Sequence, residues 1–276
     1  MNDQEIDAIV TVALQEDMPH GDVTSDNVIP PESVSEALIQ VKQQGVVAGL
    51  PVAQRVFETL NPATSFSANF TDGEAVVPGD RLAVVRGNTV ALLKGERTAL
   101  NFLQRLSGIA TLASRYVAAL QGTGTRLLDT RKTTPGMRAL EKYAVKMGGG
   151  QNHRLNLSDM VMLKDNHIQI VGSIPEAVRR ARSKVSLDIK IEVETTNLEE
   201  VQAAVESGAD MIMLDNMPLA VMKEVIDWVG GRVPLEVSGN VDLERIREIA
   251  ELGVDYISVG RLTHSYESLD ISMDFL

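Results

Sequence analysis

The chain has 276 residues, with 38 Asp and Glu against 26 Lys and Arg, a net charge of −12 and no cysteine. This length allows one large domain or two modest ones, and the missing cysteines exclude disulfides, thiolate nucleophiles and cysteine zinc sites. The negative charge, together with only four Tyr, five Phe and one Trp, argues against a surface that binds nucleic acid.

The N-terminal part mixes helical and strand-like patterns. Apolar residues at helical spacing predict helices over 2–16, 51–60, 89–106 and 109–120. Alternation predicts a strand over 36–47, and Gly-containing pairs predict turns between antiparallel strands from 65 to 90. The segment EDMPHGDVTSD is expected to be an exposed loop in which His20 has a structural role. These patterns predict an α+β domain that ends near residue 107.

After Gly124 the pattern changes to strands that alternate with helices. Strands are expected over 125–129, 159–164, 188–194, 210–214, 234–237 and 255–259. Helices are expected over 138–147, 174–184, 197–207, 218–229 and 242–252. Such repeats form either a doubly wound sheet or an α/β barrel. No GxGxxG follows a strand, which favours a barrel, complete or incomplete.

The segment from Arg126 to Lys164 is a cationic region within an acidic chain. It carries eight Lys and Arg against three Asp and Glu, a net charge of +5. Several of its basic residues follow apolar runs or glycines, at strand ends and loops where ligands bind: Arg131, Lys132, His153, Arg154 and Lys164. By contrast, Arg138, Lys142 and Lys146 are expected on the solvated face of a helix. The region predicts a pocket for an anion.

Further polar residues follow the later strands. Lys190, Glu192 and Glu194 share one strand face, where Lys190 and Glu192 could form a structural pair and Glu194 lies where barrel enzymes place catalytic groups. Asp215 follows the next strand in the same way. Small residues that follow the last two strands resemble a phosphate cradle: Ser238, Gly239, Asn240 and Gly260. We therefore expect one ring of cations and acids at the strand ends.

A series of motifs resembles the quinolinate phosphoribosyltransferase family across nearly the whole chain. The motifs are, in order, GDVTS, GERTALNFLQRLSGIAT, TRKTTPG, EKYAVKMGGGQNHR, MLKDNH, EVET, MLDN, EVSGN and SVGRLTHS. The resemblance implies an N-terminal α/β sandwich domain over 1–107 and an open, seven-stranded α/β barrel over 108–266, with residues 267–276 returning to the first domain. It also implies transfer of phosphoribosyl from 5-phosphoribosyl 1-diphosphate (PRPP) to quinolinate with loss of CO₂, as a step of NAD biosynthesis.

The same resemblance implies roles for individual residues. Lys132, Lys164, Glu194 and Asp215 would act in catalysis, and Glu194 and Asp215 would also lie near the ribose and its Mg²⁺. The substrates would be bound by Arg97, Arg131, Lys132, His153, Arg154, Lys164, Glu194, Asp215, Ser238, Gly239, Asn240 and Gly260. Arg97 would be supplied across a homodimer, or a hexamer built as a trimer of dimers. We expect Arg131 and Lys164 to orient charge rather than transfer protons.

Other functions stay open at this stage. A phosphoribosyltransferase of the same fold could act on nicotinate or on another acid, and release of CO₂ would separate the two reactions. A lyase could instead form a Schiff base on Lys164, or the chain could be a regulator that binds anions without turnover. The four histidines form no HExxH motif, so a zinc hydrolase is not expected. The N-terminus lacks a signal-like pattern and no apolar run approaches 18 residues, so a cytoplasmic protein is expected.

Overall fold

The computed structural model describes residues 2–276, which form two compact units. The first unit comprises residues 2–114, Thr133–Gly149 and Arg261–Leu276, and the barrel unit comprises Arg115–Lys132 and Gly150–Gly260. The units are interleaved along the chain, so their bounds differ from those of the two expected domains. The domains over 1–107 and 108–266 stay a prediction. No helix within residues 2–276 is both long and apolar enough to cross a membrane.

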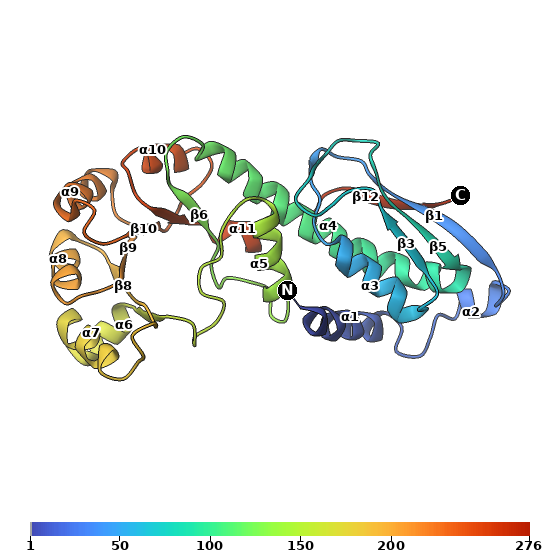
Figure 1. Ribbon diagram of the computed structural model, residues 1–276, viewed down its shortest axis with the longest axis horizontal. Helices are drawn as coiled ribbons and strands as arrows, with labels where there is room; N and C mark the ends of the chain where they lie inside the picture. The colour runs from blue at the N-terminus through green and yellow to red at the C-terminus, as the bar shows by residue number, and fades with distance from the viewer. Residues whose placement is uncertain (1) are drawn as a thin grey trace. The chain divides into compact units, whose positions relative to one another are not determined.

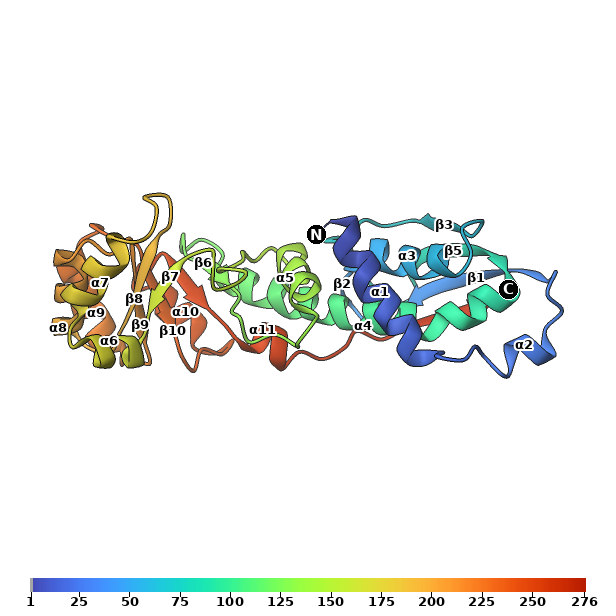
Figure 2. The same cartoon turned by 90° about the horizontal axis from the view of Figure 1, so that it is seen from below.

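The first unit is built on a four-stranded antiparallel sheet in the order β12-β1-β5-β3 (Figures 1 and 2). Its strands are β1 (Val34–Val41), β3 (Ser65–Ala68), β5 (Arg81–Asn88) and β12 (Ile271–Phe275), and a small second sheet pairs β2 (Gly45–Val46) with β4 (Ala75–Val76). The helices are α1 (Asp3–Asp17), α2 (Ser25–Val28), α3 (Leu50–Leu60), α5 (Arg138–Met147), α11 (Arg261–His264) and most of α4 (Thr89–Ala119). The apolar stripe of α3 is buried, and Phe57 stacks on Phe66 of β3.

The helix α4 is continuous over 31 residues, whereas the sequence predicts two helices over 89–106 and 109–120. Gly108 lies between the two predicted ranges, and glycine is a poor helix former. In the structure it serves close packing instead, since a Cβ at this position would lie 2.1 Å from the carbonyl oxygen of Glu267. The prediction of two helices is therefore wrong.

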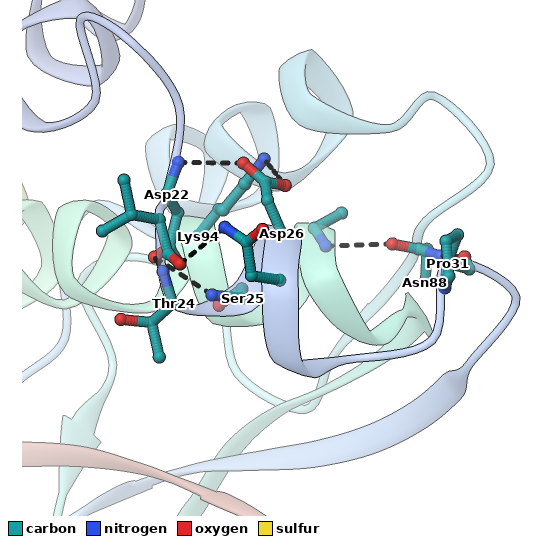
Figure 3. Close-up of polar contacts among 10 residues, drawn as sticks. Asp22, Thr24, Ser25, Asp26, Pro31, Asn88 and Lys94 are labelled. Carbon is teal, nitrogen blue, oxygen red and sulfur yellow. Dashed lines mark hydrogen bonds and ion pairs between the residues drawn. The ribbon is translucent and has the colours of Figure 1, made fainter.

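The loop expected at EDMPHGDVTSD is held by side-chain hydrogen bonds and ends in the first residues of the short helix α2 (Figure 3). Asp22 Oδ1 accepts hydrogen bonds from the backbone N–H groups of Thr24 and Ser25 at 2.9 and 3.2 Å. Asp26 Oδ1 pairs with Lys94 Nζ of α4 at 2.6 Å. The polar residues of this segment thus cap and anchor its backbone.

The barrel unit contains six parallel strands in the order β6-β11-β10-β9-β8-β7. They are β6 (Arg126–Leu128), β7 (Val161–Leu163), β8 (Ile191–Thr195), β9 (Met211–Asp215), β10 (Leu235–Ser238) and β11 (Tyr256–Ser258). Its helices are α6 (Asp165–Val171), α7 (Ile174–Arg182), α8 (Leu198–Glu206), α9 (Leu219–Val229) and α10 (Ile246–Ala250). Figure 1 shows the helices on the outer side of the curved sheet.

A single residue takes the place of the seventh strand. Gln151 forms a parallel bridge with Leu128 on the free edge of β6, with hydrogen bonds to Leu127 O and from Asp129 N. Among residues 2–276, no strand pairing joins this bridge to β7, the opposite edge of the sheet. The expectation of an open α/β barrel is therefore confirmed, with its seventh strand reduced to one bridge.

Candidate active site

A cavity of about 610 Å³ lies in the barrel unit at the carboxyl ends of the strands, where α/β barrels carry their active sites. Ten of the residues predicted from sequence line it: Arg131, Lys132, His153, Arg154, Lys164, Glu194, Asp215, Ser238, Gly239 and Asn240. Residues that the sequence analysis did not single out also line it: Asp129, Thr130, Met162, Met213, Asn216, Glu236 and Ser258. The expected ring of cations and acids is thus assembled in one place.

Two predicted residues do not line this cavity. Gly260 follows β11 and belongs to the barrel unit, but Ser258 represents that strand in the cavity wall. Arg97 lies on α4 in the first unit. Its expected role concerns a neighbouring subunit and stays a prediction.

The basic side chains that line the cavity belong to segments after β6 and β7 and to the loop that follows Gln151. Arg131 and Lys132 follow β6, and Lys164 follows β7. Burial, and then the positive charge of Arg131, lower the pKa of Arg154. Two guanidinium groups that repel each other in a partly buried cavity are stabilised by an anion between them. This side of the cavity is suited to carboxylates or phosphates.

An ion pair crosses from β7 to β8 at the rim of the cavity. Lys164 Nζ lies 2.8 Å from Glu194 Oε2, and the two side chains are 45% and 16% exposed. The backbone N–H of Lys164 donates a hydrogen bond to His167 Nδ1 at 3.0 Å, and this bond caps the start of α6. Because the pair is open to solvent, its attraction is screened and a substrate can reach both groups.

A second set of charged groups lies deeper in the barrel and forms the floor of the cavity. One of them, Glu192, is two residues before Glu194 on the same face of β8. Glu192 of β8 and Glu236 of β10 are fully buried, and His153 Nε2 lies 3.0 and 3.2 Å from their carboxylates. The two carboxyl groups are also close enough to interact with each other. We call His153, Glu192 and Glu236 the floor cluster.

The protonation of the floor cluster follows from its burial. Burial by itself lowers the pKa of His153, but the hydrogen bonds and charges of Glu192 and Glu236 more than offset it and raise this pKa to about 9. Burial, and the negative charge of Glu236, raise the pKa of Glu192. The backbone N–H of Arg154, 2.8 Å from Nδ1, favours a neutral ring instead. The two acids thus favour the charged ring, whereas the hydrogen bond accepted by Nδ1 favours the neutral one.

The pairing of Lys190 with Glu192 considered from sequence is wrong. Lys190 precedes β8 and is exposed, whereas Glu192 points into the barrel and pairs with His153. The strand begins at Ile191 rather than at residue 188 as predicted, so Lys190 lies outside it and not on its buried face. The solvated face predicted on α5 is also wrong for Lys142, which is 1% exposed; its helix is enclosed by the first unit.

Asp129 pins the loop that carries His153 and Arg154. It is fully buried, accepts from Asn152 Nδ2 at 2.5 Å and accepts from His153 N at 2.9 Å. Its position after the apolar residues of β6 is the same strand-end signal that identified Glu194 and Asp215. Asp129 was not predicted from the sequence, because this segment was interpreted by the positive charge of Arg131 and Lys132.

The loops after β9 and β10 form a close-packed cradle on the other side of the cavity. Asn216 and Asn240 have positive φ of 53° and 49°, and Asn240 Nδ2 donates to Asn216 Oδ1 at 3.1 Å. Gly239 has φ 96°, and a Cβ there would lie 2.2 Å from Asn216 Oδ1. Only glycine fits this position without displacing Asn216. The asparagine pair could be anticipated from the preference of Asn for positive φ.

Comparison with known proteins gives a consistent result over the whole chain. Models of the quinolinate phosphoribosyl transferase N-terminal and C-terminal domains match residues 22–107 and 109–274. A probable nicotinate-nucleotide pyrophosphorylase (carboxylating) of Synechocystis sp. is 44% identical over 266 residues, which are 95% of this chain and 90% of the relative. One from Bacillus subtilis is 41% identical, over 99% of this chain and 94% of its own. The crystal structure of NadC from Streptococcus pyogenes superposes with a TM-score of 0.96 at 42% identity, covering 100% of this chain and 99% of that one.

Proposed function

The chain belongs to the quinolinate phosphoribosyltransferase family, and we propose that the cavity of the barrel unit is where it carries out the decarboxylating transfer of phosphoribosyl from PRPP to quinolinate. The products are nicotinate mononucleotide, CO₂ and diphosphate, as in a step of NAD biosynthesis. The observation that carries the proposal is the joint presence of four strand-end cations and two strand-end acids in one cavity: Arg131, Lys132, Arg154, Lys164, Glu194 and Asp215.

The cationic side is proposed to bind quinolinate. Quinolinate carries two adjacent carboxylates on a planar ring, and the planar fork of a guanidinium matches a carboxylate. Arg131 and Arg154 are close enough for the charge of one to lower the pKa of the other. Each charge-assisted hydrogen bond to such a dianion contributes about 1.5–3 kcal/mol.

The opposite side is proposed to bind the phosphoribosyl group. Glu194 and Asp215 would hold the ribose hydroxyls and stabilise positive charge that develops at the anomeric carbon. The cradle of Ser238, Gly239 and Asn240 would hold the 5′-phosphate, whose oxygens can approach the glycine backbone closely. Lys132 and Lys164 would serve as point charges for phosphate, a role that suits lysine.

The reaction then needs orientation rather than a protein nucleophile. The lone pair of the pyridine nitrogen forms a bond to the anomeric carbon, and the bond from that carbon to diphosphate breaks with its electron pair on the leaving oxygen. In the ribosylated ring, the bond to the 2-carboxylate breaks, CO₂ leaves, and its electron pair stays on the ring carbon beside the pyridinium nitrogen until a proton arrives. No cysteine or activated serine is required.

The donor set is compatible with the expected Mg²⁺. Carboxylate oxygens suit this ion, which protein sites often hold through one or two carboxylates together with substrate phosphates. Glu194 and Asp215 would supply these oxygens, directly or through water and ribose hydroxyls, and the bound ion would neutralise the departing diphosphate. Neither residue belongs to a preformed three-ligand group among residues 2–276, which agrees with an ion that arrives with PRPP.

A homodimer, or a hexamer made of three dimers, is part of the proposal, with Arg97 supplied to the neighbouring subunit's cavity. Mixing two inactive variants tests this. A mixed dimer of Arg97→Ala with Arg131→Ala has one site with both changes and one with neither, so activity should return on mixing if Arg97 acts across subunits. No recovery in dimers shown by mass spectrometry to be mixed would place Arg97 in its own subunit's site or in none. A cytoplasmic location also stays a prediction, which cell fractionation tests.

The reaction itself is tested by supplying quinolinate labelled with ¹⁴C in its 2-carboxylate, with PRPP and Mg²⁺. CO₂ release that depends on PRPP, with formation of nicotinate mononucleotide, is expected. Nicotinate offered in place of quinolinate should give no product. Product from nicotinate and no CO₂ from quinolinate would assign the cavity to a related substrate instead.

A further inference from the structure

The floor cluster raises a question that the proposed chemistry leaves unanswered. Glu192 and Glu236 are fully buried, and the binding of quinolinate and PRPP proposed above uses neither. Buried carboxylates are costly unless they are paired, so their presence calls for a role. Their shared partner is His153, one residue before Arg154 in the loop that follows Gln151.

The imidazole is held from below by two different strands. Glu192 belongs to β8 and Glu236 to β10, with β9 between them in the sheet. The distances of 3.0 and 3.2 Å place Nε2 between the two carboxylates, and only 7% of the His153 side chain is exposed. The ring nitrogen that faces the acids therefore cannot also bind a substrate carboxylate. His153 lines the cavity as a buried charge rather than as an exposed donor.

The backbone beside the ring is held separately by Asp129 after β6. Asp129 Oδ1 accepts from His153 N at 2.9 Å, so the residue is fixed by its side chain and by its backbone. The only strand pairing of this loop among the described residues is the single bridge at Gln151, so side-chain hydrogen bonds carry much of its positioning. The next residue, Arg154, is tied to the His153 ring by its backbone N–H, which donates to Nδ1 at 2.8 Å, and its guanidinium donates to Met160 O at 3.0 Å.

We propose that Glu192 and Glu236 are positioning residues that clamp the His153 imidazole from β8 and β10 and thereby fix the loop that presents Arg154 to the carboxylates of quinolinate. The inference rests on the proposed function, because it assigns the loop a substrate. It also explains why the cluster lies directly beneath the cationic side of the cavity. Negative charge in the cluster would oppose the positive charge of the cations that line the cavity.

The test compares Glu192→Gln, Glu236→Gln and the double variant with the wild type. Glutamine keeps the shape of the side chain and can still accept a hydrogen bond, but it removes the charge that holds the imidazolium. Each single change is expected to raise the KM for quinolinate about 5- to 50-fold, with the KM for PRPP and kcat within about threefold. Glu224→Gln, an exposed acid of α9, is the matched control and should leave all three constants unchanged.

A spectroscopic readout separates clamping from general destabilisation. The protein has four histidines, and His153→Gln assigns the His153 signals in protein labelled with ¹⁵N in histidine. At pH 7.5 the wild-type ring should show the two equivalent nitrogen shifts of an imidazolium, and the double Glu→Gln variant should show a neutral ring. Thermal unfolding of every variant shows whether it is folded under assay conditions.

Three results would overturn the clamp. A neutral His153 ring in the folded wild-type protein would remove the charge on which it depends, and a selective effect on PRPP would assign the acids to the other substrate. One equivalent of divalent metal that stays bound after dialysis and is lost in Glu192→Gln would make the cluster a metal site, since its three ligand atoms lie within 4.8 Å of one another. Absence of turnover in the wild type would reject the proposed function, while the ring signature would still test the clamp.

Discussion

The floor and the rim of the cavity hold the same kinds of charge in different surroundings. Glu192 and Glu194 lie two residues apart on one face of β8; the first pairs with a buried histidine and the second with a half-exposed lysine. Solvent screens the rim pair, so it contributes little to stability and can exchange its partner for a substrate. The floor cluster cannot exchange partners, because a buried charge without a partner is strongly destabilising. The depth of a glutamate along β8 thus decides its role: the buried Glu192 forms a fixed pair, and the partly exposed Glu194 can bind a substrate.

The largest expected effect comes from breaking the floor. His153→Ala leaves two buried carboxylates without a cation, so the free energy of unfolding should fall by about 3–5 kcal/mol. Urea denaturation followed by circular dichroism measures this change. A loss below 1 kcal/mol would mean that the floor behaves like the rim, and the distinction between them would fail.

A change of pH tests the same cluster without mutation. The pKa of His153 is raised from its ordinary 6.5 to about 9, so its contribution to stability is fully present below about pH 6.5 and is lost as the pH rises through 9. The 2.5-unit difference corresponds to about 3 kcal/mol. Urea denaturation from pH 6 to 9.5 should show this decline, and His153→Gln should flatten it. A constant wild-type stability over this range would contradict a charged ring.

Gly239→Ala tests the part of the rim that is made of backbone. The new Cβ would meet Asn216 Oδ1 at 2.2 Å and would also have to adopt φ 96°. Strain of about 1–3 kcal/mol should appear as a KM for PRPP raised about 5- to 150-fold, measured by initial rates. Gly253→Ala is the control, since its φ is 93° but nothing lies within 4 Å of the added Cβ. Equal effects of the two changes would attribute the loss to backbone strain alone.

Arg131→Ala removes one guanidinium from the cationic side. We expect kcat/KM for quinolinate to fall at least tenfold, about 1.4 kcal/mol, with little change in unfolding free energy. Arg126→Ala, at the opposite end of the same strand, is the control. An unchanged kcat/KM would remove Arg131 from the site.

The smallest change in stability is expected at the rim pair. Lys164→Ala should alter the free energy of unfolding by no more than about 1 kcal/mol, because Lys164 is 45% exposed and Glu194 remains partly hydrated. Its effect should instead be on turnover of PRPP and quinolinate. A loss of stability as large as that of His153→Ala would show that exposure does not govern these charges.

Site residues could be predicted from the sequence where a local pattern alone decides their position. Strand-end positions identified Glu194, Asp215 and Gly239, because parallel strands bring their carboxyl ends to one edge. The partner of Glu192 could not be predicted in this way, since His153 comes from a distant loop and reaches it only through the register of several strands. Lys142 on α5 resembled a solvated residue, and only tertiary packing reveals that it is buried. The close approach of Gly108 to Glu267 likewise depends on tertiary structure.

The pairing of β12 with β1 has a consequence for synthesis on the ribosome. Val41 and Ile271 are partners in the sheet of the first unit, yet they lie 230 positions apart in the chain. Every strand of the barrel unit is translated between them. The nascent first unit therefore emerges with one side of β1 unpaired, and this strand has to avoid pairing with other chains until β12 leaves the exit tunnel. The unit made first is the last to be completed.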